Sequence, residues 1–386
     1  MRFPEFSEDW VQYKCSDLLE FYSTNSLSWE QLDYDNNDLL NLHYGLIHVG
    51  LPTLVNVEQH NLPSVKPKFK PKNYTLCKSG DIAFADASED TNEVAKPIEF
   101  YDCSDKQVVC GLHTIHGRDK LNATEIGFKG YAFSSMPFHH KIRRLAQGSK
   151  IYSISSKNFS EVTIGIPQKE EQRKIVDLLS KLEERITTQN KIIQQLQSLI
   201  KGIRYIIYTQ LDCEWVQLSN LVVNGLITLK RGNVIPKYEY SEEYCYPVYS
   251  SSTQNGGLMG YFNTYMFDKS LISWSIDGGG NFFYRDKHKF NVTNVCGYLE
   301  ADESKFDYRF ISELLIYQHS RMVFDYQTKA HPSVIEAMYY LPILDLEKQQ
   351  CYSKLFEHIY DKLDRETSLL NKYEEQKKFL LFNMFI

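Results

Sequence analysis

The chain has 386 residues, of which 42% are hydrophobic and 24% charged, and a formal net charge of −6 at pH 7. This length exceeds one average domain, and the ordinary apolar content excludes a largely disordered chain. The net negative charge excludes a protein that simply coats nucleic acid with an overall basic surface. DNA binding stays open, because affinity depends on the local charge that faces the phosphates. No run of about 20 apolar residues and no apolar signal region occur, so we expect a soluble, cytoplasmic protein. The eight cysteines form no C-x-x-C pair, which favours reduced, buried thiols.

The first part of the chain, residues 1–165, reads as a mixed α/β domain. The stretch "LCKSGDIAFADAS", residues 76–88, predicts a turn that enters a half-buried strand. An amphipathic helix and an apolar strand follow in "FHHKIRRLAQGSKIYSIS". The pattern therefore predicts a first globular domain.

Residues 166–212 predict one long helix that begins near Pro167. Apolar residues recur in steps of four and three, the 3.5-residue period of a coiled coil. The seam positions are Ile175, Leu179, Leu182, Ile186, Gln189, Ile193, Leu196, Ile200 and Ile203. At about 1.5 Å per residue this seam spans roughly 42 Å, so it needs a partner of similar length.

The partner lies in the same chain, because the whole pattern is repeated. Residues 213–340 predict a second α/β domain, in which "KSLISWSIDGGGNFFY" reads as strand, glycine turn and aromatic strand, and Trp10-Val11-Gln12 recurs as Trp215-Val216-Gln217. Residues 341–386 predict a second helix after Pro342, with two extra residues before its glutamines. A shift of 177 residues converts the first seam into Tyr352, Phe356, Ile359, Leu363, Glu366, Leu370, Tyr373, Lys377 and Leu380.

The repeat predicts an α+β fold: two pseudo-symmetric mixed α/β domains joined by two long helices that form an antiparallel coiled coil. Gln189 and Glu366 occupy the same polar position in mid-seam, so antiparallel pairing brings them together. A polar layer in an apolar seam costs stability but fixes register and orientation.

Over essentially its full length the chain resembles the DNA-specificity subunit of type I restriction–modification systems. The resemblance rests on the "RFPEF" opening, "SGDIAFADAS", "YPVYSSSTQNGG", "GGGNFFYRD" and the duplicated order. Each helix of that family follows a proline and a Glu-Gln pair, here Glu171-Gln172 and the looser set Glu347, Gln349 and Gln350. The second helix departs further from the pattern, because polar Lys377 interrupts its seam.

The resemblance implies a non-catalytic subunit whose two domains each read half of an asymmetric bipartite DNA site. The helices would set the half-site spacing and dock two modification subunits that use S-adenosylmethionine. Two restriction subunits would supply ATP- and Mg²⁺-dependent translocation and cleavage, so this chain itself would need no cofactor. Half-sites on one face of B-DNA lie about 34–36 Å apart, which suits the length of the seam.

Lysine and arginine contact phosphates, and arginine, amide and hydroxyl side chains read base edges. In the first domain the candidates are Lys66, Lys68, Lys70 and Lys72, which prolines would hold extended, and Arg118, Lys120, His139, Lys141, Arg143 and Arg144. In the second they are Lys230, Arg231, Ser251, Ser252, Thr253, Gln254, Asn255, Asn281, Arg285 and Lys287. Arg118, Arg231 and Arg285 rank first, and the alternative for any one basic cluster is a merely solvated surface.

The chain lacks the motifs of a catalytic centre. It has no G-x-x-x-x-G-K-[ST] loop for nucleotides and no G-x-S-x-G elbow. The triplet Glu303-Ser304-Lys305 resembles a nuclease E-x-K, which often arises by chance.

One group of residues has a spacing that nominally suits zinc: Cys103, Cys110, His113 and His116. Structural zinc sites usually pair cysteines two to four residues apart, and this first loop is longer. We therefore expect packed thiols and a strand histidine here, with no metal site.

A second function remains open, a scaffold with two protein-binding domains on a coiled-coil strut. Salt-dependent binding to one bipartite DNA sequence over scrambled DNA would distinguish the recognition subunit from the scaffold. A third hypothesis is a stand-alone enzyme fused to recognition domains, which predicts that the chain alone methylates or cuts DNA.

Overall fold

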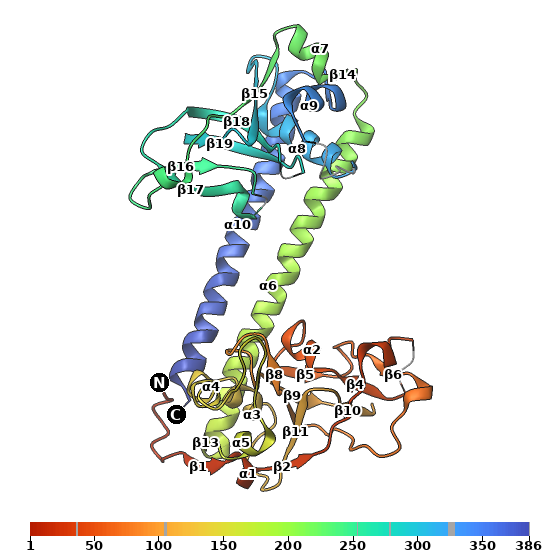
Figure 1. Ribbon diagram of the computed structural model, residues 1–386, viewed down its shortest axis with the longest axis vertical. Helices are drawn as coiled ribbons and strands as arrows, with labels where there is room; N and C mark the ends of the chain where they lie inside the picture. The colour runs from red at the N-terminus through yellow and green to blue at the C-terminus, as the bar shows by residue number, and fades with distance from the viewer. Residues whose placement is uncertain (36–37, 104–105, 253, 278, 323–328, 386) are drawn as a thin grey trace. The chain divides into compact units, whose positions relative to one another are not determined.

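A computed structural model describes residues 1–35, 38–103, 106–252, 254–277, 279–322 and 329–385 (Figure 1). The chain divides into two compact units. Unit 1 comprises Met1–Thr188 and Leu369–Ile386, and unit 2 comprises Gln189–Ser368. Each unit therefore combines one globular part with a portion of both long helices. None of the helices in the described ranges has an apolar stretch that could cross a bilayer.

Unit 1 contains a five-stranded sheet in the order β2-β11-β7-β9-β5 and a four-stranded sheet in the order β10-β4-β6-β3. Two smaller sheets pair β1 with β13 and β12 with β8. The strands are β1 Val11–Lys14, β2 Leu19–Tyr22, β3 Leu32–Asp33, β4 Leu40–Leu42, β5 Leu54–Asn56, β6 Ser64–Val65, β7 Ile82–Ala85, β8 Ala87–Ser88, β9 Pro97–Asp102, β10 Val108–Cys110, β11 Thr114–Asp119, β12 Tyr152–Ser153 and β13 Thr163–Ile166. The helices are α1 Cys15–Leu18, η1 Trp29–Gln31, α2 Tyr44–His48, η2 Pro67–Phe69, α3 Phe128–Phe133, α4 Met136–Arg143 and α5 Ser156–Ser160.

Unit 2 contains a six-stranded sheet in the order β15-β20-β18-β19-β16-β17 and the small pair β14-β21. Its strands are β14 Trp215–Gln217, β15 Ile227–Arg231, β16 Tyr246–Tyr249, β17 Leu258–Phe262, β18 Phe267–Ser275, β19 Phe282–Val292, β20 Cys296–Ala301 and β21 Tyr340–Pro342. Its helices are α7 Leu218–Val223, η3 Lys237–Glu239, η4 Gln254–Gly257, α8 Tyr308–His319 and α9 Pro332–Met338.

The two units share one sheet plan. Strands β2, β11, β7, β9 and β5 correspond in order to β15, β20, β18, β19 and β16. The directions agree as well, because the first four form antiparallel pairs while β5 and β16 each run parallel to their neighbour. The small pairs β1-β13 and β14-β21 also correspond. The structure thus confirms the predicted duplication, and β17 is an addition in unit 2.

Strand β7 shows how unit 1 builds its interior. Successive strand side chains point to opposite faces, so a strand between two cores is apolar throughout. Ile82 and Phe84 lie in one hydrophobic cluster, and Ala83 and Ala85 lie in another. The strand is therefore fully buried, whereas the sequence predicted a half-buried strand.

The long helices are α6, Lys169–Gln210, and α10, Leu346–Asn383. Helix α6 begins after residue 166 because Thr163–Ile166 forms β13 and pairs with β1. Every seam position predicted in the two helices is buried or half-buried. In unit 1 the start of α6 shares a core with the end of α10, and in unit 2 the end of α6 shares a core with the start of α10 (Figure 1). The helices are therefore antiparallel, as predicted.

The polar seam positions have partners. Gln189 Nε2 donates to the Glu366 backbone oxygen at 3.1 Å and also to the Glu366 carboxylate. Lys377 Nζ lies 2.6 Å from Glu183 Oε1. The lysine that interrupts the second seam is thus neutralised within unit 1.

Candidate nucleic-acid interface

In unit 2 the predicted polar loop after β16 folds against two other segments. Ser275 Oγ donates to the Ser251 backbone oxygen at 3.1 Å, and Thr293 Oγ1 lies 3.0 Å from Ser250 Oγ. Asn255, Gly256 and Gly257 all have positive φ, which turns the loop back toward the sheet. These contacts fix the loop backbone, while Gln254 and Asn255 remain exposed. We call residues 250–252 and 254–257, together with Arg285, the unit 2 loop cluster.

Arg285 lies beneath this loop. Its Nε donates to Ser273 Oγ at 2.8 Å, and its guanidinium carbon lies 3.6 Å from the centre of the Tyr249 ring. Gly257, next to the guanidinium, has a φ of +84°, and a methyl group there would lie 3.0 Å from the Ser250 backbone oxygen, so the turn of the loop favours glycine at this position. The side chain is 7% exposed, and burial lowers the pKa of Arg285 to about 10.

No carboxylate in the described part of the chain forms an ion pair with Arg285, and its nearest neighbours are aromatic rings and hydroxyl groups. Burying a cation without a counter-ion costs free energy unless an anion or a hydrogen-bond acceptor contacts it. Arg285 is therefore a buried donor held in a fixed position, and little of it reaches the surface.

The other unit 2 candidates lie around this cluster. Lys230 and Arg231 are exposed at the end of β15, and Arg231 Nε donates to the Asn294 backbone oxygen at 2.9 Å. A β-bridge joins Asn233 to Thr293, whose hydroxyl lies 3.0 Å from Ser250 Oγ of the loop. The remaining candidates are Ser252, which accepts from the Gln254 backbone, Asn281, whose backbone oxygen accepts from Ser275, and exposed Lys287. Thr253 lies outside the described residues.

In unit 1, Arg118 is held by an acidic partner. Its Nε and Nη2 lie 2.7 Å from the two oxygens of Asp81, and its guanidinium carbon lies 4.8 Å from the Tyr22 ring centre. The hydrogen bonds with Asp81 raise the pKa of Arg118. Burial disfavours the Asp81 carboxylate, but hydrogen bonds from Arg118 and His116 outweigh it and lower the Asp81 pKa. Arg118 is about a quarter exposed, so only part of its donor set faces solvent.

The lysines of the "KPKFKPK" stretch are not extended as predicted. Pro67–Phe69 forms the 3₁₀ turn η2, because Pro67 supplies the fixed φ that starts such a turn. Lys66 Nζ donates to the Glu30 backbone oxygen at 2.7 Å, and Lys68 lies 4.8 Å over the Phe69 ring. Lys70 and Lys72 are exposed. Lys120, elsewhere on unit 1, donates to the Ser16 backbone oxygen at 2.6 Å.

The "HHKIRR" stretch forms α4 and divides between surface and interior. Arg143 and Arg144 are exposed, whereas Lys141 donates to the Thr163 backbone oxygen at 2.9 Å. His139 is 8% exposed, and burial lowers its pKa to about 4. His139 is therefore neutral and inside the domain at pH 7, not on a surface that meets phosphate.

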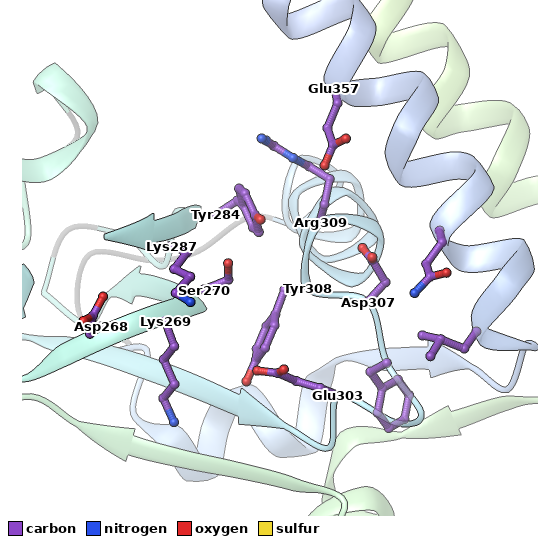
Figure 2. Close-up of a pocket in the computed structure, with 13 residues that line it drawn as sticks. Asp268, Lys269, Ser270, Tyr284, Lys287, Glu303, Asp307, Tyr308, Arg309 and Glu357 are labelled. Atoms are coloured by element: carbon purple, nitrogen blue, oxygen red, sulfur yellow. The ribbon is translucent and has the colours of Figure 1, made fainter. Parts of the chain in front are cut away.

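A polar cavity of about 320 Å³ lies beside the starts of α8 and α10 in unit 2 (Figure 2). Asp307 caps α8 by accepting from the Phe310 backbone at 3.0 Å, and it also accepts from Ser353. Arg309 lies over the Tyr284 ring at 3.9 Å. The charged groups here join the globular part to the helix, and they do not form a nucleophile–base pair.

A glutamine joins each globular part to its long helix. Gln172 accepts from the Glu125 backbone at 2.7 Å and donates to the backbone oxygens of Ala123 at 2.9 Å and Pro167 at 2.8 Å. Gln349 makes the same three bonds, to Asp307 at 3.0 Å, Lys305 at 2.8 Å and Leu344 at 2.7 Å. The 177-residue shift that aligns the seams also aligns these two residues, so Gln349 is the counterpart of Gln172.

A tyrosine–glutamate hydrogen bond also joins each globular part to its long helix, but the two residue types swap places between the units. In unit 1, Tyr131 of α3 donates to Glu183 of α6 at 3.0 Å. In unit 2, Tyr360 of α10 donates to Glu313 of α8 at 3.2 Å. The phenol lies on the globular part in one unit and on the helix in the other.

The comparisons with known proteins agree with this architecture. Residues 103–198 and 220–375 match the family model described as "Type I restriction modification DNA specificity domain". The Type I restriction enzyme MpnII specificity subunit of Mycoplasma pneumoniae is 28% identical over 178 residues, which are 44% of this chain and 54% of that relative. The chain spans 36% of the length of one further relative from that organism and 97% of another.

Two solved structures share the fold. The S subunit of a type I restriction–modification system from M. genitalium superposes with a TM-score of 0.65 at 17% identity, covering 100% of this chain and 99% of that one. A chain from a structure of the type I R-M system that concerns complex assembly and conformational transition gives a TM-score of 0.57 at 12% identity, covering 98% and 97%. The family model matches more than half of the chain, which therefore belongs to the type I restriction modification DNA specificity domain family.

Proposed function

We propose that this chain is the sequence-specific DNA-recognition subunit of a type I restriction–modification complex, and that each unit reads one half of an asymmetric bipartite site. The observation that carries the proposal is the repeated sheet plan, in which the same five strands in the same order carry unlike loops. The repeated fold supports two DNA-recognition domains of the same type, and the unlike loops support recognition of two different half-sites.

The proposal assigns spacing to α6 and α10 and catalysis to partner subunits. Helices of 42 and 38 residues with a shared seam are suited to hold readers at a fixed interval. Their exposed flanks would dock two modification subunits, which bind S-adenosylmethionine, and two restriction subunits, which use ATP and Mg²⁺, in the cytoplasm. This chain would be non-catalytic, so the purified subunit alone should neither methylate nor cut DNA.

Within unit 2 we assign base or phosphate contact to the loop cluster. Ser273 and Tyr249 hold the guanidinium of Arg285, which lies next to Gly256 and Gly257, and these glycines follow the exposed Gln254 and Asn255. A bidentate contact from arginine to a base is worth about 1–3 kcal/mol of discrimination. That value corresponds to roughly 5- to 150-fold in affinity.

The first test is methylome sequencing of cells with and without the gene. A two-part methylated motif should disappear on deletion, and no change in any such motif would contradict the proposal. The second test measures DNA binding by the chain assembled with its modification subunits.

In that assay Arg285→Lys and Arg285→Ala should weaken binding and relax one half-site while the other half-site stays fixed. Arg321→Ala is the matched control, since Arg321 is exposed in the globular part of unit 2 and lies outside the loop cluster. Binding that never prefers a bipartite sequence over scrambled DNA would instead favour a protein-interaction scaffold.

A further inference from the structure

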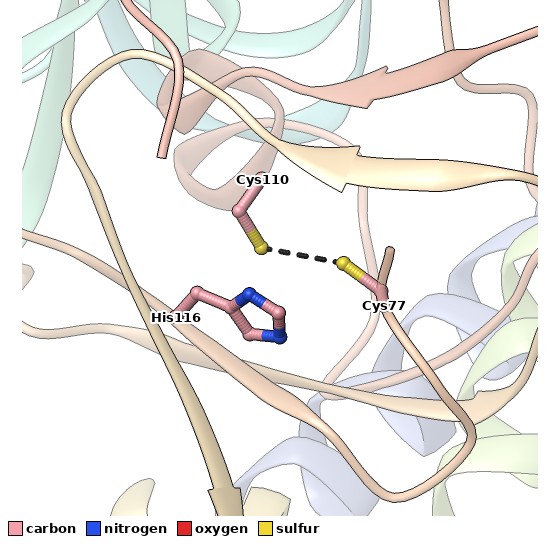
Figure 3. Close-up of side chains that lie close together, drawn as sticks. All are labelled: Cys77, Cys110 and His116. Atoms are coloured by element: carbon pink, nitrogen blue, oxygen red, sulfur yellow. Dashed lines mark hydrogen bonds between the residues drawn. The ribbon is translucent and has the colours of Figure 1, made fainter. Parts of the chain in front are cut away.

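Three side chains from separate segments of unit 1 meet in its interior. Cys77 precedes β7, Cys110 ends β10 and His116 lies in β11. Their ligand-capable atoms all lie within 4.8 Å of one another, and the two sulfur atoms are 3.5 Å apart (Figure 3). The residues are 5%, 2% and 1% exposed, so water does not surround the group.

The tautomer of His116 is set by its other neighbour. His116 Nε2 lies 2.8 Å from Asp81 Oδ2, and Asp81 is kept ionised by its ion pair with Arg118. Nε2 therefore carries the proton and donates, which leaves a lone pair on Nδ1. Nδ1 is buried and has no hydrogen-bond partner among the described residues. A buried acceptor without a partner is unfavourable unless something completes it.

We propose that Cys77, Cys110 and His116 bind one Zn²⁺ ion. The thiol of Cys103 lies in the same hydrophobic cluster but outside the group whose ligand atoms are all within 4.8 Å of one another, so it would have to move to become a fourth ligand. Two Zn–S bonds of about 2.3 Å in a tetrahedron place their sulfur atoms roughly 3.8 Å apart. A disulfide would need about 2.05 Å. At the observed 3.5 Å one thiol donates a hydrogen bond to the other, which excludes a disulfide, and the two sulfur atoms are already close to the spacing that one metal ion requires.

The surroundings complete the pattern of a structural zinc site. A metal-bound histidine usually donates its second ring nitrogen to a carboxylate, which orients the ring and raises its basicity, and Asp81 has that position here. Two thiolates balance the charge of the ion, and Arg118 balances Asp81. Cys103 is 4% exposed and lies in the same hydrophobic cluster as Cys77 and Cys110.

The sequence pattern pointed to a different set. The C-x6-C-x2-H-x2-H spacing includes His113, but His113 is half exposed and faces Asp86 at 3.1 Å. In the structure Cys77, which lies 33 residues before Cys110, replaces His113 in the cluster. It can do so because β7 and β10 belong to neighbouring sheets that share a core. Local spacing cannot reveal such a ligand.

The metal would also position Arg118 through His116 and Asp81, a consequence that rests on the proposed DNA-binding function. Metal binding itself does not depend on the proposed DNA-binding function. Loss of DNA binding with metal content unchanged would count against the proposed function alone, and absence of metal with DNA recognition intact would count against the zinc site alone.

The test begins with the full chain, purified without chelators and supplied with Zn²⁺ or Co²⁺. We expect about one zinc ion per chain by mass spectrometry, and a Co²⁺ spectrum with thiolate charge-transfer and tetrahedral bands. X-ray absorption on the zinc-loaded protein should show two or three sulfur ligands and at least one nitrogen ligand.

Cys77→Ser, Cys110→Ser and His116→Ala should each lower the metal content severalfold. Cys15→Ser should retain it, since Cys15 is equally buried in unit 1 but lies outside the cluster. X-ray absorption and Co²⁺ spectra of the unchanged chain keep the test valid if a variant fails to fold. The proposal is overturned by a metal-free chain after reconstitution, by an oxygen-only ligand shell, by unchanged metal content in Cys77→Ser, or by a Cys77–Cys110 disulfide under reducing purification.

Discussion

Replacing Gln172 with leucine should loosen unit 1 and leave unit 2 unchanged. The side chain is 0% exposed and makes three hydrogen bonds to backbone groups of the loop before α3 and the residue after β13. Leucine has similar volume, so the change removes the bonds rather than the packing. Each bond contributes about 0.5–1.5 kcal/mol net, and the stranded backbone groups add to the loss, which gives roughly 2–4 kcal/mol in total.

Hydrogen exchange with mass spectrometry measures this effect for each unit separately. A loss of about 2–4 kcal/mol accelerates exchange from the core strands of unit 1 by roughly 30- to 800-fold. Gln349→Leu should give the reciprocal result, with faster exchange in unit 2, because its three bonds are equivalent. Gln350→Leu is the control, since Gln350 is exposed next to Gln349 on the same helix. An acceleration below about threefold, or an equal one in both units, would refute the reasoning.

Two further predictions concern other buried polar groups. Gln189→Leu alone should lower the melting temperature, because it leaves the half-buried Glu366 without its amide donor, while leucine at both positions should raise the temperature above that of the unchanged chain. A double variant less stable than the single one would contradict this interpretation. For His139 the folded pKa of about 4 lies below its usual value of 6.5, so its stabilising contribution is full above about pH 6.5 and is lost as the pH falls toward 4. His139→Leu should therefore remove about 2–3 kcal/mol of the stability difference between pH 7 and pH 4.5 in urea unfolding, and an unchanged difference would place the histidine outside the core.

The sequence was most informative where a pattern is long. The seams of α6 and α10 and their 177-residue shift predicted antiparallel helices, since a 3.5-residue period sustained over four heptads is typical of paired long helices. The shift also carries the Gln172 contacts to Gln349, two residues further from Pro342 than Gln172 is from Pro167. Those two extra residues are visible in the sequence alone.

The sequence was least informative where a side chain could point either way. Arg285 and His139 are polar residues in basic stretches, yet strand and helix periodicity turn both inward, to Ser273 and to the core around Phe138. The cluster of Cys77, Cys110 and His116 depends on the pairing of distant strands, and no local spacing encodes it. Candidates on the surface, such as Arg143, Arg144 and Lys287, stay predictions that DNA-binding measurements must decide.

The exchanged phenol–carboxylate contact limits how such a chain can evolve by recombination. Moving the second globular part into the first position would bring Glu313 against Glu183, two carboxylates that are 2% and 15% exposed. Like charges in so little water repel each other, and Lys377, which already pairs with Glu183, would have to neutralise both carboxylates. Moving the first part into the second position would place the phenol of Tyr131 against that of Tyr360 and leave Arg204, now 2.6 Å from Glu313, without its acid. The two globular parts are thus each matched to their own helix, and a viable exchange must carry residue 183 or 360 along with the globular part.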